Sequence, residues 1–153
     1  MAAWTEILEG VQVALSGEAE QGRRALLDCW SRTDPSDAAQ RCVLAHYLAD
    51  LEADAEQEAA WDERALEAFG RVADEDLMPV GIASAAAMAP SLHLNLGEVY
   101  RRLGRVDEAQ EQAAAGLASV WLLADDGYGH LIREGLARLA ERLGEPPATG
   151  GTG

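Results

Sequence analysis

The sequence predicts an all-α protein built from antiparallel helix pairs. Apolar residues recur at helical spacing, as in the stripe that runs from Trp4 through Leu8 to Leu15. Alanine is abundant and only eight of the 153 residues are aromatic, a composition that favours close-packed helices over a β-sandwich. A chain of this length forms one domain, which we place at residues 1–144, followed by a flexible tail rich in proline, glycine and threonine at residues 145–153.

Turn signals divide the first half of the chain into four helices. Glu18 follows Gly17 and opens the second helix. Pro35 cannot lie in a helix interior, so it separates the second helix from the third. Between the third and fourth helices the residues leave almost no room for a turn. We expect these helices at about residues 3–16, 18–32, 37–53 and 55–73.

A long connection, residues 74–90, separates these helices from the rest. It contains Pro79, Gly81 and Pro90 among small apolar residues, with room for one short helix. Connections of this length inside a compact domain are often lids or binding loops. We therefore expect this segment to fold over the functional surface.

Three further helices are expected at about residues 91–103, 106–121 and 128–143. Gly104 ends the first of them, because glycine adopts positive φ at little cost. A turn follows at residues 125–129, and Gly144 ends the last helix. This last helix is apolar on one face and charged on the other, as expected of a capping helix.

One stretch carries a recognisable repeat motif. It combines Leu96, Gly97, Tyr100, Gly104 and Ala109, and it resembles the tetratricopeptide repeat (TPR), a helix–turn–helix unit of about 34 residues. The resemblance implies that the two small residues let the paired helices approach closely. It also implies a right-handed superhelix in which the first helix of each pair lines a concave, ligand-binding groove.

A fainter copy of the motif lies near the start of the chain, where Gly10, Gly17 and Gly22 repeat the spacing of residues 97, 104 and 109. Four other blocks resemble those of short actinobacterial proteins of this repeat class, for which no activity is assigned. These blocks are residues 42–50, 60–62, 91–95 and 125–129.

Charge and cysteine usage limit the choice of partners. The net charge is −15 and the isoelectric point is near 4.4, so nucleic acid and anionic membrane surfaces are not expected as partners. A cationic partner fits this charge, and so does a solvated acidic surface that maintains solubility.

Cys29 and Cys42 lie among apolar neighbours and are expected to be buried free thiols. With neither a signal sequence nor a membrane-spanning run visible, we expect a cytoplasmic protein.

The helix at 91–103 presents polar residues to the predicted groove. Asn95 with Arg101 and Arg102 is suited to binding a carboxylate, because arginine holds it through two parallel hydrogen bonds. The alternative is that these arginines pair with Glu98 and Asp107.

A second cluster is formed by histidines. His46 and Asp50 share one helix face, and His93 lies on another first helix. Such groups fit a divalent metal, an acid–base pair or a buried polar network. The chain carries no HExxH motif, nucleophile elbow or glycine-rich phosphate loop, so we assign no catalytic residue, metal or cofactor.

The candidate site is therefore the groove between the third and fifth helices. Its candidate residues are His46, Asp50, His93, Asn95, Glu98, Arg101 and Arg102. The leading hypothesis is a non-catalytic interaction module that binds a peptide or protein segment. The alternatives are a small-molecule or metal-binding protein, or a cryptic enzyme, that uses the polar cluster, and a homodimer whose groove is filled by its partner chain.

Overall fold

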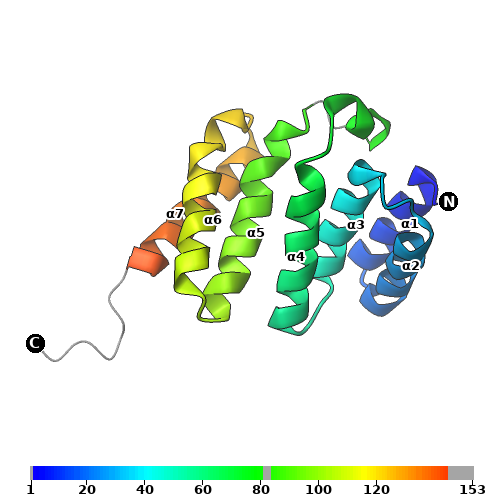
Figure 1. Cartoon of the computed structure of the whole chain (residues 1–153), viewed down its shortest axis with the longest axis horizontal. Helices are drawn as coiled ribbons and strands as arrows, with labels where there is room; N and C mark the ends of the chain where they lie inside the picture. Colours follow the sequence, from blue (N-terminus) through cyan, green and yellow to red (C-terminus); the bar gives the residue numbers. More distant parts are fainter. Residues whose placement is uncertain (1, 81–83, 145–153) are drawn as a thin grey trace, which may run out of the picture. The chain divides into compact units, whose positions relative to one another are not determined.

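The computed structural model describes residues 2–80 and 84–144, and this part of the chain forms helices without any strand (Figure 1). The prediction of an all-α fold with helices packed in adjacent pairs is confirmed. The α-helices are α1 (Trp4–Leu15), α2 (Ala19–Arg32), α3 (Ala38–Asp50), α4 (Ala55–Phe69), α5 (Ala89–Arg102), α6 (Val106–Ala118) and α7 (Gly127–Gly144). Short 3-10 helices occur at η1 (Asp74–Val80), η2 (Ala86–Met88) and η3 (Val120–Leu122).

Most of the predicted helix ends lie within two residues of the observed ends, with three exceptions. Helix α4 ends at Phe69 and α3 ends at Asp50, each earlier than expected. Helix α6 stops at Ala118, where the Ser119 hydroxyl donates to the Gly116 carbonyl, and η3 follows. Helix α5 begins earlier than expected and includes Pro90 in its first turn, where a missing N–H costs no helical hydrogen bond.

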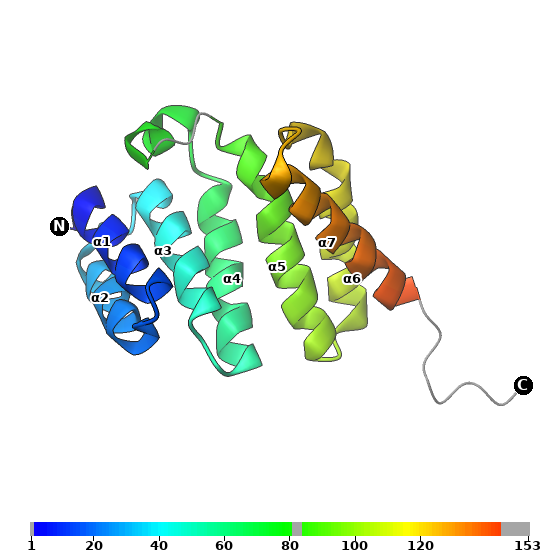
Figure 2. The ribbon, with the colours of Figure 1, turned by 180° about the vertical axis from the view of Figure 1, so that it is seen from behind.

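The helices group into two compact units, one up to Met88 and one from Ala89 onward. In the first unit α1 pairs with α2 and α3 with α4, and α2 also contacts α3. In the second unit α5 pairs with α6, and α7 packs against both (Figure 2). Helix α7 therefore covers the α5–α6 pair, as expected of a capping helix. The tail predicted at residues 145–153 lies outside the described residues, as does Gly81 of the predicted connection.

Two helix pairs turn in the same way, 87 residues apart. Gly104 has φ 77°, and the Arg105 N–H donates to the Tyr100 carbonyl at 2.9 Å. At the equivalent place Gly17 has φ 103°, and the Glu18 N–H donates to the Val13 carbonyl at 3.3 Å. Both bonds span six residues, which is the hydrogen bond of the Schellman motif that ends helices at a left-handed glycine. The turn expected at Gly104 is confirmed, and the fainter N-terminal copy shares its geometry.

Small residues bring the paired helices together. A Cβ built on Gly22 of α2 would lie 2.6 Å from the Ala14 Cβ of α1. One built on Gly97 of α5 would lie 3.2 Å from the Gln112 Cβ of α6 and 3.6 Å from the Ala109 carbonyl oxygen. The expected close approach of the two helices at Gly97 and Ala109 is thus present. Gly97 also faces α7, which the repeat motif did not indicate, with Leu139 Cδ2 2.8 Å from the built Cβ.

The tryptophans differ in how deeply they are buried. Trp61 is buried, and its ring meets the half-buried Trp30 edge-on at 5.0 Å. Trp121, by contrast, is 77% exposed. The reason is that α6 ends before this residue, and η3 no longer continues the apolar face of the helix. Both cysteines are buried free thiols, as predicted.

Candidate functional site

The predicted site residues lie in both units. His46 and Asp50 belong to α3 in the first unit. The remaining candidates all belong to α5 in the second unit: His93, Asn95, Glu98, Arg101 and Arg102. A groove that joins α3 to α5 would span the two units and stays a prediction.

His46 and Asp50 form an electrostatically linked pair on α3. The half-buried His46 ring meets the Tyr47 ring at 5.1 Å with an interplanar angle of 64°. Burial lowers the pKa of His46, and the Asp50 carboxylate opposes this effect without cancelling it. Desolvation raises the pKa of the Asp50 carboxyl group, which is opposed by His46 and reinforced by Glu58. The neutral imidazole is therefore favoured at pH 7.

We expect His46 to titrate below its ordinary pKa of 6.5 in NMR titrations of its ring protons. The unfolded chain then binds more protons at this site just below pH 6.5, so His46 reduces stability as the pH falls through that window. Replacement of Asp50 by asparagine removes the charge that favours the imidazolium, and should lower the pKa of His46 further. A pKa of 6.5 or above, or a rise in the variant, would contradict this account.

The His93 side chain forms a hydrogen bond within its own helix pair. Its Nδ1 lies 2.8 Å from Gln112 Oε1 of α6, so the imidazole bridges α5 and α6. A Cβ built on Gly116 of α6 would lie 3.3 Å from the His93 Cβ, which places the side chain at a tight crossing of the two helices. Within residues 2–80 and 84–144, no group of three or more His, Cys, Asp or Glu side chains is placed to hold a metal ion.

The Glu98 carboxylate pairs mainly with an arginine on its own helix. Its Oε1 lies 2.6 Å from Arg101 Nη2, and its Oε2 accepts from Arg101 Nε at 3.2 Å. The pKa of Glu98 is lowered, chiefly by this hydrogen-bonded pair. Arg142 of α7 approaches the same carboxylate at 3.8 Å. The pairing of an arginine with Glu98, weighed as an alternative to ligand binding, is present for Arg101.

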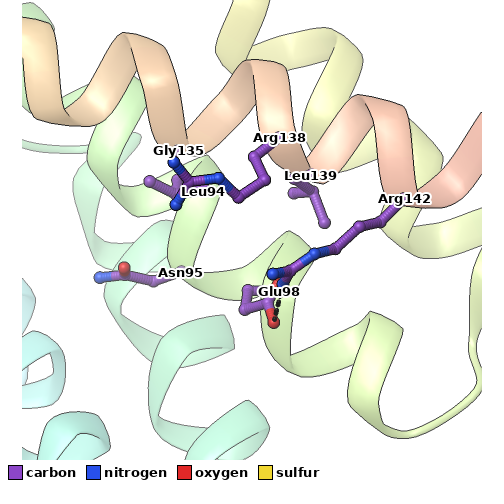
Figure 3. Close-up of a pocket in the computed structure, with 7 residues that line it drawn as sticks. All are labelled: Leu94, Asn95, Glu98, Gly135, Arg138, Leu139 and Arg142. Carbon is purple, nitrogen blue, oxygen red and sulfur yellow. Dashed lines mark ion pairs between the residues drawn. The ribbon is translucent and has the colours of Figure 1, made fainter.

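A hollow of about 290 Å³ opens between α5 and α7, within the second unit (Figure 3). Arg142 reaches toward Glu98, whereas the Asn95 side chain points away from both (Figure 3). Arg138 lines the same hollow as Leu94. The lining residues are Leu94, Asn95, Glu98, Gly135, Arg138, Leu139 and Arg142.

This hollow, which we call the α5–α7 groove, contains two of the predicted residues, Asn95 and Glu98. The sequence pattern did not indicate that residues of α7 line this groove, because the charged face of a capping helix is expected to face solvent. The spacing of Gly135, Arg138 and Arg142 at three and four residues could have indicated a common face.

A second, polar hollow of about 330 Å³ lies in the first unit, beside the start of α3. Its carboxylates already accept hydrogen bonds from backbone N–H groups. Asp37 accepts the Gln40 N–H and caps α3, Asp34 accepts from Ser36, and Asp76 accepts the Ala73 N–H. These roles account for the acidic cluster without a ligand.

Comparison of the chain with protein-family models, with curated proteins and with solved structures gave no match. The TPR-like assignment therefore still depends on the motif in the sequence. No helix in the part of the chain that the structure describes is long and apolar enough to cross a membrane.

Proposed function

We propose that this protein is a non-catalytic, TPR-like interaction module that binds a peptide or protein segment in the α5–α7 groove. The observation that carries the proposal is the composition of the groove. Leu94 supplies apolar surface over the buried Leu139, while arginines from α7 and polar residues from α5 stand around it. Apolar surface with a few convergent polar groups is typical of binding pockets.

The alternative function, metal or small-molecule binding or catalysis by the histidine cluster, has less support. His93 is engaged with Gln112 in its own helix pair, so a ligand or substrate would have to compete with that hydrogen bond. The buried free thiols of Cys29 and Cys42 are typical of a reducing compartment and support a cytoplasmic location.

The proposal is tested by selecting, from a library of random decapeptides with blocked ends, the peptides that bind the full chain. Selected peptides should bind saturably in fluorescence polarisation. We expect Gly135→Leu to weaken them at least tenfold, because a Cβ at this position would lie 2.8 Å from Leu94 Cδ2 and the side chain would fill the groove. Gly144→Leu is the matched control on the same helix, since a Cβ there meets nothing within 4 Å.

Amide chemical-shift mapping of a selected peptide on the unaltered chain gives a second readout that does not depend on the variant folding. Shifts on α5 and α7 are expected. Failure to select any saturable binder, or shifts confined to α1–α4, would overturn the proposal. A concentration-dependent dimer whose interface buries α7 would instead favour the homodimer alternative.

A further inference from the structure

One face of α7 continues from the groove-lining residues to the start of the helix and has two chemically different halves. Tyr128, Leu131, Gly135, Arg138 and Arg142 follow one another at intervals of three or four residues, so they share one face of the helix. The tyrosine and the leucine are 57% and 64% exposed. Exposed apolar residues at one end and arginines at the other make this face an asymmetric surface.

Arg138 is the cation available to a ligand. Glu98 is held chiefly by Arg101, and Arg142 is already directed to Glu98. Arg138 is exposed and forms no ion pair with another residue of the described ranges. A ligand carboxylate can therefore pair with Arg138 without displacing an ion-pair partner within residues 2–80 and 84–144. Arginine binds carboxylates through two parallel hydrogen bonds.

The charge distribution along the chain makes this unit the better place for an anionic group. Residues 1–88 hold eighteen carboxylates and six arginines, whereas residues 89–153 hold nine and six. The strong negative charge of the protein thus belongs mainly to the first unit. A carboxylate approaching α7 meets less repulsion than the net charge of −15 suggests.

The spacing of the two halves limits the shape of the ligand. Leu131 and Arg138 are seven residues apart, which corresponds to about 10 Å along a helix. In a polyproline II segment, residues three apart lie on the same side and about 9 Å apart. In a β-strand, same-side residues are about 7 or 13 Å apart, so they match less well. An α-helical ligand would match this distance with residues seven apart, so selection of that spacing would count against an extended ligand.

Building on the proposed function, we propose that the ligand is an extended, polyproline II-like peptide segment in which an apolar side chain and an Asp or Glu side chain are three residues apart. The apolar side chain packs on Leu131 and Tyr128, and the carboxylate pairs with Arg138. Gly135 and Leu94 line the hollow between these two contacts, and the Leu94 side chain packs directly against Gly135.

The experiment uses the peptides recovered from the blocked library. They should be enriched in an apolar residue and an acidic residue at a spacing of three. Changing the acidic residue to its amide should weaken binding to the wild-type chain about tenfold or more. The same change should have little effect on binding to Arg138→Gln, because the pair has already been lost. Arg24→Gln is the control of equal charge change, since Arg24 is an exposed arginine on α2 in the first unit.

The outcomes separate this inference from the proposed function. If Gly135→Leu abolishes binding but the amide peptide binds as tightly as the acidic one, the module stands and the inference fails. The inference also fails if binding requires a free C-terminal carboxylate, or if the preferred spacing is two, four or seven residues. Equal losses for Arg138→Gln and Arg24→Gln would show a general charge effect and would equally reject it.

Discussion

Replacement of Gly22 by alanine is expected to destabilise the first unit by about 3 kcal/mol or more. The added Cβ would lie 2.6 Å from the Ala14 Cβ and 2.7 Å from the Ala14 Cα and N atoms. Because two of these atoms belong to the backbone of α1, no side-chain rotation can relieve the contact. The α1–α2 pair must therefore move apart, which opens voids along the whole interface.

Urea unfolding followed by tryptophan fluorescence would measure this change, since Trp30 and Trp61 report on the first unit. Gly70→Ala is the matched control. Its Cβ would meet only the Glu67 carbonyl oxygen, at an ordinary 3.5 Å. We expect the control to change stability by less than about 1 kcal/mol. If Gly22→Ala were equally mild, the tight crossing of α1 and α2 would be wrong.

Replacement of Gly97 by leucine is expected to destabilise the second unit by about 3 kcal/mol or more. A side chain at this position projects into both partners of α5, because its Cβ would lie 2.8 Å from Leu139 Cδ2 of α7 and 3.2 Å from the Gln112 Cβ of α6. Leu139→Ala alone should cost about 2–5 kcal/mol, since it leaves a cavity at a residue that is 1% exposed.

Combined, these two changes should cost less than the sum of the single changes. A leucine at position 97 can enter the space that the Leu139 side chain leaves, so a coupling of at least about 1 kcal/mol is expected. Urea unfolding of the four proteins measures it, with Gly144→Leu as a control for adding a leucine to the surface. Strict additivity would mean that Gly97 and Leu139 are not in contact.

Much of the fold could be predicted from local patterns. Helical periodicity and turn residues located the seven α-helices of the described residues, because both signals are local in the sequence. Gly104 could be placed at a helix end because glycine adopts the left-handed backbone conformation of such a turn without steric cost. Helix ends that depend on packing were less accurate, as at Ala118, after which Trp121 turns toward solvent.

The candidate site was predictable only in part, because a site is formed by contacts between helices. The sequence alone determined the all-α class, the order of the helices, the burial of both cysteines and the candidacy of Asn95 and Glu98. Only the tertiary structure decided that His93 bonds to Gln112 and that Arg138 of the capping helix lines the same hollow as Leu94. These residues are 19 and 44 positions apart in the chain. Periodicity describes one helix at a time, whereas the pairing of side chains from different helices depends on how the helices cross.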